Sequence, residues 1–337
     1  MSAQRRILLT GASSGIGFEA AVRLRQAGHR LVLPCRDDAT AGATLRRLRE
    51  RVADGSEPSA PVADLADLKS VERCAAELLA KGEPIDVLVL NAGLQYAGAT
   101  EPRRSAQGVE LTFAVNHLAH MVLAERLLPL LVAGQAPRLV VTASEVHDPA
   151  TGGGRVGRPA GLGNLEGLKR GPDFAMVDGL SRFDAEKAYK DSKLCNLLFA
   201  REFERRAREQ DTPLTVIAWS PGLVIPRDRG GFFRFSRTHN EWGQRLFAFV
   251  ARDLLRLSES VEDAGALLAG LATDPAENAP GFCYRANRLI APGRHRLEAA
   301  SPSVEASDSA RARLLWDLTG RLAAMLEEGT AAEHRSH

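Results

Sequence analysis

The chain has 337 residues, 45% of them hydrophobic, which is enough for one large α/β domain or two small ones. Its 44 basic and 42 acidic residues nearly balance, so charge gives no general attraction to nucleic acid. Four widely spaced cysteines without metal-ligand spacing, no leading signal peptide, and no apolar run near the ~18 residues of a membrane span together predict a reduced cytoplasmic protein without a metal.

The first predicted elements are a buried strand over residues 6–10 and a helix over 16–27, joined by the turn GASSGIG. Gly11, Gly15 and Gly17 let the backbone approach a phosphate closely, and the helix offers free N–H groups and the positive end of its dipole. Their spacing differs from the common dinucleotide fingerprint, so a glycine turn without a ligand remains an alternative. The position between the first strand and the first helix favours a dinucleotide site.

A second strand is predicted over residues 30–34, and Cys35 and Arg36 follow it. In a dinucleotide fold this strand end meets the adenosine ribose, where an acidic side chain binds the 2′-hydroxyl group and an arginine accommodates a 2′-phosphate. Arg36 therefore favours NADPH over NADH as the cofactor. The alternative is that Arg36 pairs with its neighbour Asp37 instead.

Strands and helices then alternate, which predicts a parallel, doubly wound α/β sheet. The next predicted elements are a helix at 38–52, a strand at 60–63, a helix at 67–81 and a strand at 85–90. Asp64 and Leu65 follow the third strand, and Asn91, Ala92 and Gly93 follow the fourth. Both groups lie at carboxyl ends of strands, where open α/β sheets bind their ligands.

A long helix is expected over residues 107–133 with Asn116 inside it, followed by a strand at 138–144 that ends in Ser144. Taken alone, an amide in a helix is usually neutral filler, and a serine at a strand end is more often a cap than a catalyst. Residues 145–182 then interrupt the alternation, being rich in glycine and without clear periodicity. A stretch of this length predicts a functional loop or a disordered segment.

A helix over residues 184–209 carries Tyr189 and Lys193, whose spacing of four places them on one face. A free tyrosine has a pKa of about 10 and is a poor proton donor near neutrality. A neighbouring ammonium favours the phenolate and can lower that pKa by roughly 1–3 units. The pair predicts an acid/base device, although a solvated helix face carries the same spacing often.

The last third of the chain is predicted to hold a strand at 214–220 before Pro221 and Gly222, a helix at 260–272, a strand at 281–284 and a helix at 308–327. Residues 231–257 interleave aromatic residues with arginines. This pattern predicts a lid or a packed helix pair, or else a surface that contacts a membrane or a large apolar ligand. We expect one domain over 1–330, with the 145–182 insertion, a substrate-side lid at 223–257 and a disordered tail at 331–337.

Together these motifs resemble the short-chain dehydrogenase/reductase family. The resemblance implies a Rossmann fold and NAD(P)-linked hydride transfer. Ser144 would orient the reacting group, and Tyr189 would relay a proton. Lys193 would hold the ribose and lower the tyrosine pKa, and Asn116 would support a water chain. The implied cofactor-binding residues are Gly11, Ser13, Ser14, Gly15, Ile16, Gly17, Arg36, Asp64, Leu65, Asn91, Ala92, Gly93, Tyr189, Lys193, Pro221 and Gly222.

A narrower resemblance spans most of the chain. Most family members place the serine much closer to the tyrosine, whereas Ser144 and Tyr189 lie 45 residues apart. The insertion with GLGNLEGLKRG, the stretch EPRRSAQGVELTFAVNHLAH and the tail EASDSARARLLWDLTGRL resemble the light-dependent protochlorophyllide reductases. That resemblance implies NADPH-dependent, light-driven reduction of the C17–C18 double bond of protochlorophyllide, a porphyrin-type pigment, with the proton from Tyr189 or a water that it organises.

The substrate half departs from that group at three places. Ser220 and Leu223 stand where its members usually have a tyrosine and a cysteine, and CYRANRL at 283–289 replaces a tryptophan-rich segment. Leu223 suits an alternative, a dark NADPH-linked carbonyl reductase of the retinol or steroid type. A third interpretation is a cofactor-binding scaffold or pigment carrier without activity. A homo-oligomer and peripheral contact with a membrane are compatible with the resemblance.

Overall fold

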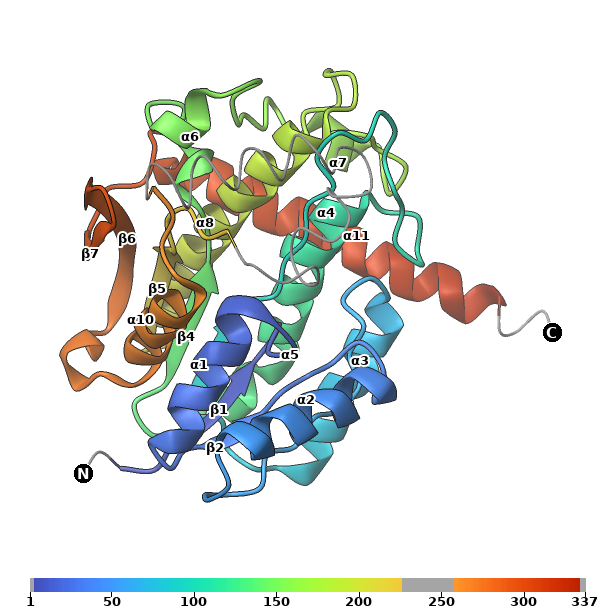
Figure 1. Cartoon of the computed structure of the whole chain (residues 1–337). Helices are drawn as coiled ribbons and strands as arrows, with labels where there is room; N and C mark the ends of the chain where they lie inside the picture. The colour runs from blue at the N-terminus through green and yellow to red at the C-terminus, as the bar shows by residue number, and fades with distance from the viewer. Residues whose placement is uncertain (1–2, 226–256, 334–337) are drawn as a thin grey trace.

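A seven-stranded sheet in the order β2-β1-β3-β4-β5-β6-β7 forms the centre of the computed structural model (Figure 1). The structure describes residues 3–225 and 257–333. Neighbouring strands from β2 to β6 run parallel, and β7 pairs antiparallel with β6. The strands are β1 (Arg6–Leu9), β2 (Arg30–Val32), β3 (Val87–Leu90), β4 (Arg138–Thr142), β5 (Thr215–Ser220), β6 (Gly281–Ala291) and β7 (Arg294–Ala299).

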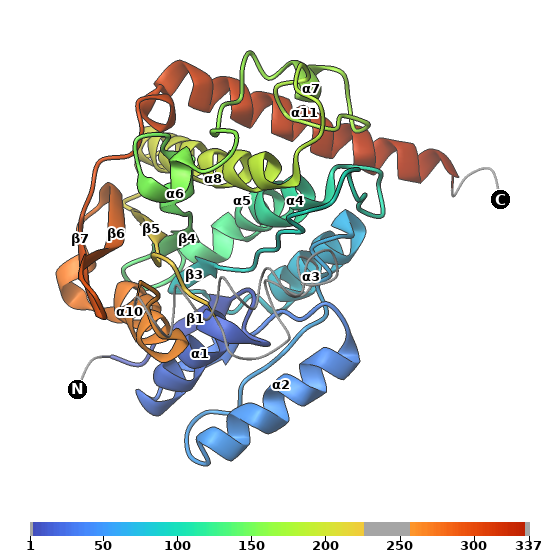
Figure 2. The same ribbon diagram turned by 45° about the horizontal axis from the view of Figure 1, so that its top comes forward.

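Helices cover both faces of this sheet, as the predicted alternation requires (Figure 1 and Figure 2). One face packs against α1 (Gly15–Gln26), α2 (Asp38–Arg51) and α10 (Val261–Thr273). The other packs against α3 (Leu68–Lys81), α5 (Ala119–Val132) and α8 (Ala185–Glu209), with α11 (Ser309–Glu333) lying against α8. The shorter elements are α4 (Leu111–Phe113), η1 (Ala114–Leu118), η2 (Glu145–His147), α6 (Gly152–Arg155), α7 (Glu166–Lys169), η6 (Pro275–Glu277) and η7 (Glu305–Ser307).

The central strands are buried along their whole length. Every residue of β1, β3, β4 and β5 is buried. Parallel strands with helices on both faces have no solvated side, which is why their sequences read as continuous apolar runs without alternation. The predicted fold class, one α/β domain with a doubly wound and mostly parallel sheet, is confirmed.

The strand predicted at 60–63 is reduced to isolated bridges beside β2, from Val32 to Ser59 and from Cys35 to Val62. Pro61 interrupts this segment, and a proline has no N–H group to donate to a sheet ladder. The segment still places Asp64 at the same edge as the other strand ends, because Ala63 N donates to Cys35 O at 2.6 Å.

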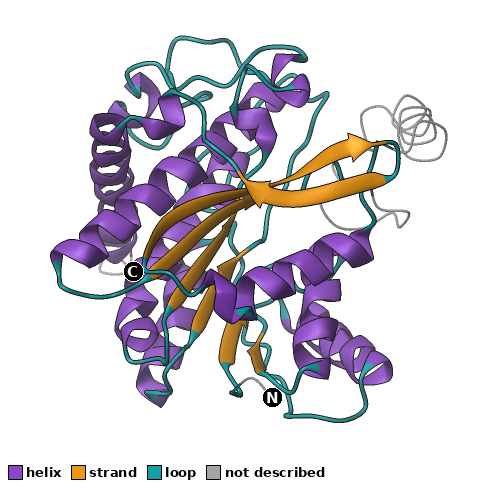
Figure 3. Cartoon of the chain, turned by 90° about the vertical axis from the view of Figure 1, so that its left-hand side faces the viewer, coloured by secondary structure: helices purple, strands orange, loops and turns teal. Residues whose placement is uncertain are grey.

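Two further boundaries differ from the prediction. The helix expected at 107–133 begins only at Leu111, where Glu110 caps it, and a π-helical turn at 114–118 interrupts it around Asn116. The short strand expected at 281–284 is the first part of β6, which continues into the hairpin with β7 that the sequence analysis missed. Figure 3 shows this hairpin extending beyond the other strands at the sheet edge.

The insertion at 145–182 folds into short helices and packs its apolar residues into the larger core. Leu162, Leu165, Leu168 and Phe174 are buried there. The description of this stretch as a loop is therefore correct for most of its residues, whereas the alternative of a disordered segment is wrong. Its apolar residues are spaced too irregularly to show a helical or strand period, although they are numerous enough to fill the core.

The predicted lid and membrane-contacting surface fall mostly at residues 226–256, which lie outside the described residues. So do residues 334–337 of the predicted tail, whereas α11 continues to Glu333. Within the described ranges, no helix combines the length and the apolar character needed to cross a bilayer. The same part of the chain contains no cluster of three or more acidic, histidine or cysteine side chains arranged to hold a metal.

Candidate functional site

The glycine turn at 11–17 packs backbone against backbone with the turn that follows β3. Gly11 has a φ of +74°, and a Cβ atom there would lie 2.8 Å from the Cα of Ala92. A Cβ on Gly17 would lie 2.3 Å from the carbonyl oxygen of Gly11. Neither position accepts a side chain, so these glycines create a shallow backbone cradle.

The N-terminus of α1 opens onto this cradle. Its N-cap residue, Ser14, makes no side-chain capping bond. The first N–H groups of α1 therefore remain available to an anion, and the helix dipole favours a negative charge at this end. A cradle without Cβ atoms beside an uncapped helix N-terminus fits a pyrophosphate. Ser13, Gly15 and Ile16 lie in the same turn.

Thr10, the residue after β1, fixes the second turn over the first. Its hydroxyl oxygen accepts hydrogen bonds from the backbone N–H groups of Asn91 at 2.9 Å and Ala92 at 3.0 Å. The same oxygen lies 3.0 Å from Nε2 of His120. Because Thr10 already accepts two N–H groups, its own proton points to His120, which then accepts at Nε2. The predicted site residues Asn91 and Ala92 are therefore held by two residues that sequence analysis missed.

Asn116 lies in the π-helical turn and is completely buried. Its Oδ1 atom accepts from Leu94 N at 2.8 Å, and its Nδ2 atom donates to Leu94 O and to Ser192 Oγ, each at 3.0 Å. Its carbonyl oxygen lies 3.1 Å from Nδ1 of His120. A π-turn of this kind often marks a functional site in a helix. Here it interrupts the regular α-helical hydrogen-bond pattern of the backbone around Asn116.

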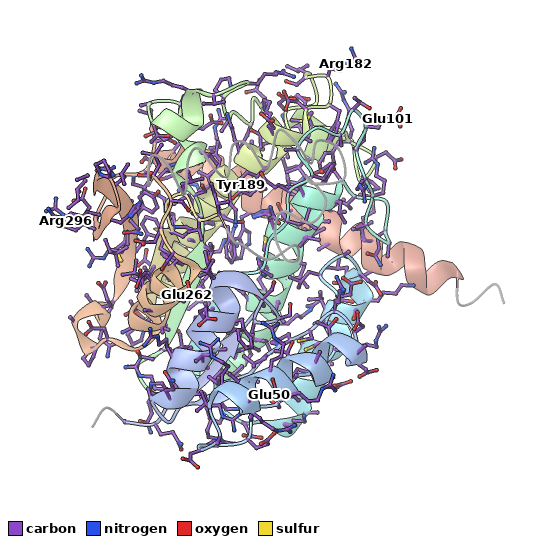
Figure 4. All side chains as sticks on the ribbon, viewed as in Figure 1. Glu50, Glu101, Arg182, Tyr189, Glu262 and Arg296 are labelled. Carbon is purple, nitrogen blue, oxygen red and sulfur yellow. The ribbon has the colours of Figure 1, made fainter. Side chains whose placement is uncertain are left out.

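Tyr189 and Lys193 project from α8, which Asp184 caps, and Tyr189 lies near the middle of the molecule (Figure 4). The Nζ atom of Lys193 lies 5.6 Å from the centre of the Tyr189 ring and donates to the carbonyl oxygen of Thr142 at 3.0 Å. The Ser144 side chain, just beyond β4, forms a hydrogen bond with Tyr189. The structure thus brings together the three predicted groups from two elements that are far apart in the chain.

The pKa values of this pair move in opposite directions. Burial raises the pKa of Tyr189 well above its ordinary value, and the hydrogen bond with Ser144 opposes that shift. Burial lowers the pKa of Lys193 to about 8. The net pKa of Tyr189 is raised because desolvation of the phenolate outweighs the hydrogen bond with Ser144, and the role of Lys193 in lowering that pKa stays a prediction.

The remaining predicted residues also lie at the carboxyl edge of the sheet. A Cβ atom on Gly93 would lie 3.4 Å from Asn116 Oδ1 and 3.6 Å from Lys193 Nζ, so this turn borders the catalytic candidates. Gly222, two residues after β5, has a φ of +76° and donates its N–H to the hydroxyl oxygen of Ser220 at 3.4 Å. Pro221 precedes it, and Leu65 follows Asp64 at the end of the bridged segment beside β2.

Arg36 lies where predicted, but it is paired. Its Nε atom donates to Asp37 Oδ2 at 3.0 Å, and both side chains are about half exposed, 50% and 49%. Asp37 also caps α2 by accepting from Thr40 N at 2.6 Å. The alternative that Arg36 pairs with Asp37 is therefore the one observed in the structure.

Thr142 and Asn196 also belong to the candidate site, although sequence analysis missed them. The Thr142 carbonyl oxygen accepts from Lys193 Nζ and, at 3.2 Å, from Asn196 Nδ2. Its hydroxyl group donates to Asn91 Oδ1 at 3.2 Å. The spacing of three between Lys193 and Asn196 places both on one helix face, which is the signal that could have identified Asn196.

The sequence of this chain is similar to those of known reductases. The family model for short chain dehydrogenase matches residues 5–153. A protochlorophyllide reductase of Avena sativa is 36% identical over 323 residues, covering 94% of this chain and 98% of the relative. Protochlorophyllide reductase A of Oryza sativa subsp. japonica is 35% identical over 327 residues, covering 95% and 81%. The chain belongs to the short-chain dehydrogenase family.

Solved structures share the fold of this chain. An uncharacterised protein from Mycobacterium paratuberculosis superposes with a TM-score of 0.66 at 25% identity, covering 96% of this chain and 94% of that one. L-sorbose reductase from Gluconobacter frateurii, solved with NADPH and L-sorbose, has a TM-score of 0.59 at 18% identity and covers 87% and 97%. At these identities the likeness extends to the fold.

Proposed function

We propose that this protein is an NADPH-dependent reductase that reduces the C17–C18 double bond of protochlorophyllide in a light-driven reaction. The protochlorophyllide reductases described above support the substrate, because the similarity covers 94–95% of the chain. The observation that carries an acid/base role is the hydrogen bond between Ser144 and Tyr189, one helical turn from the buried Lys193.

The cradle and its surroundings fit a dinucleotide. The backbone at Gly11–Gly17 and the uncapped start of α1 would hold the pyrophosphate, and Lys193 would hold a ribose hydroxyl group. Asn91–Gly93 would support the nicotinamide end, since these residues border Asn116 and Lys193. Arg36 would face the 2′-phosphate. When bound, NADPH supplies the hydride.

The chain itself would supply the proton. A tyrosine whose pKa is raised remains protonated at neutral pH, so Tyr189 suits the role of donor in a reduction better than that of base. Ser144 holds the phenol in position. Lys193, with a pKa of about 8, is mostly protonated at pH 7 and can return a proton toward the phenol through water.

Purified protein mixed with NADPH and protochlorophyllide tests the proposal directly. Absorption is recorded in the dark and after a flash, and the pigment product is identified by its red-shifted band. Product that forms only after illumination is expected. Bound pigment without product under light would instead assign the chain to the class of pigment carriers.

Leu223 favours a second candidate, a dark NADPH-linked carbonyl reductase. Leu223 follows the Pro221–Gly222 turn, is 37% exposed, and offers no thiol at that place. Such an enzyme needs only the Ser144, Tyr189 and Lys193 groups to reduce a carbonyl group. Oxidation of NADPH in the dark by retinal or a steroid ketone, with no pigment turnover under light, would select this candidate.

A further inference from the structure

Arg47 reaches from α2 to the glycine turn at the proposed cofactor site. Its Nη1 atom donates to the carbonyl oxygen of Ser13 at 2.9 Å. Its guanidinium carbon lies 4.2 Å above the centre of the Phe18 ring, in the first turn of α1. Two independent contacts therefore orient this guanidinium beside the turn, although Arg47 lies outside every motif that the sequence analysis used.

The charge at this place is otherwise balanced. Hydrogen bonds from Thr40 and from Arg36 lower the pKa of Asp37, so its carboxylate is ionised at neutral pH. The pair of Arg36 and Asp37 therefore carries no net charge. A phosphate monoester carries about −1.5 to −2 at pH 7. Arg36 alone, already shared with a carboxylate, leaves that charge incompletely matched.

Arg47 carries the unbalanced positive charge that the pair of Arg36 and Asp37 lacks. Its two contacts, a carbonyl oxygen and an aromatic ring, are uncharged. Among residues 3–225 and 257–333, no carboxylate forms an ion pair with it. A guanidinium has five N–H donors in a fixed plane. With one of them on Ser13 and the plane held against Phe18, the others stay available to a phosphate group.

We propose that Arg47 is a second cation for the 2′-phosphate of NADPH and sets the preference for NADPH over NADH together with Arg36. This inference rests on the proposed cofactor, and it assigns the selectivity to α2 as well as to the end of β2. The phosphate would lie between the Ser13 turn, which holds the Arg47 guanidinium, and the start of α2, which Arg36 precedes. Arg36, which is paired with a carboxylate, and Arg47, which is not, then both bind the 2′-phosphate, and Arg47 contributes more.

The test compares Arg47→Met with Arg46→Met. Methionine keeps an apolar chain over Phe18 and removes the charge. Arg46 is the matched control because it is the neighbouring exposed arginine of α2, and its guanidinium lies back along that helix near Gly42. Dissociation constants for NADPH, NADH, 2′,5′-ADP and 5′-ADP are measured by cofactor fluorescence and calorimetry, without pigment.

We expect Arg47→Met to weaken NADPH and 2′,5′-ADP by about 10- to 100-fold, the usual value of a hydrogen bond to a charged group. NADH and 5′-ADP should change by less than about twofold, and Arg46→Met should leave all four unchanged within the same margin. The effect should shrink with added salt because the site is exposed.

Equal weakening of NADPH and NADH would overturn the proposal and reduce Arg47 to a packing role against Phe18. Unchanged NADPH binding would also overturn it. If Arg47→Met does not fold, Arg47→Lys replaces it: a retained NADPH preference supports the charge, and equal weakening of both cofactors refutes it. Wild-type protein that binds NADH as tightly as NADPH would instead refute the proposed cofactor, an outcome that the wild-type measurement shows before any variant is made.

Discussion

The two faces of α8 hold the site by different physical means. One face carries Tyr189 and Lys193 toward the cofactor turns, where the contacts are hydrogen bonds among mostly uncharged groups such as Thr142. The opposite face carries Lys187 and Asp191 toward the insertion at 145–182, and Lys190 reaches the same insertion from the flank between the two faces.

Buried charges anchor the insertion. Lys187 Nζ lies 2.5 Å from Asp191 Oδ2, 3.3 Å from Asp178 Oδ2 and 2.7 Å from the carbonyl oxygen of Gly161. Lys190 Nζ donates to three carbonyl oxygens of the insertion, those of Gly154, Val156 and Arg158. Helix α8 thus has a chemical face, with Tyr189 and Lys193, and a structural face, with Lys187 and Asp191. Single substitutions on the two faces should therefore affect activity and stability separately.

The largest expected effect lies on the chemical face. Tyr189→Phe removes the proton donor and should lower turnover by about 10²- to 10⁴-fold, the usual contribution of a general acid. The ring remains, so the dissociation constant for NADPH and the midpoint of unfolding should stay close to those of the wild type. Flash-induced product formation and cofactor fluorescence measure both quantities. A variant with undiminished turnover would exclude Tyr189 as the donor.

On the structural face, Lys187→Met leaves Asp191, which is completely buried, without its cation. Breaking a buried pair in this way should lower the free energy of unfolding by about 3–5 kcal/mol. Lys169→Met is the matched control. It breaks an exposed pair with Glu166 within the same insertion, which should cost less than about 1 kcal/mol. Urea unfolding measures both, and similar losses would mean that the buried pair does not anchor the insertion.

The sequence predicted the chemical face better than the structural one. The turn glycines, Asn91–Gly93 and Tyr189 follow strands or occupy one helix face, so their meeting at one edge follows from the order of elements. The sequence analysis did not single out Lys187 and Asp191, because oppositely charged residues at a spacing of four are common on solvated helix faces and nothing local shows that the insertion folds over them. The sequence named the pairing of Arg36 with Asp37 only as an alternative, because side-chain directions decide it, and the reach of Arg47 to the Ser13 turn depends on a side-chain direction that no spacing reveals.

The third effect concerns His120, behind the cofactor turns. Burial lowers its pKa to about 4 from an ordinary value near 6.5. As the pH falls below about 6.5 the unfolded chain takes up this proton and the folded chain does not, so stability is lost from there down to about pH 4. Between pH 7 and pH 5 the loss should be about 2 kcal/mol. His120→Gln should remove that part of the slope in urea titrations, while His117, whose pKa burial lowers in the same direction, keeps part of it. An unchanged slope would mean that His120 does not stay neutral in the fold.

The smallest effect tests the charge balance at the other end of the cofactor. Asp37→Asn keeps the cap of α2, because asparagine caps a helix about as well as aspartate, and it removes the carboxylate that pairs with Arg36. NADPH should then bind up to about fivefold more tightly, the value of an exposed ion pair, with little change for NADH. Arg36→Ala should act in the opposite direction and weaken NADPH more than NADH. If Asp37→Asn weakened NADPH, the carboxylate would be orienting Arg36 toward the phosphate, and the pair would act as one binding group in which the arginine depends on its neighbour.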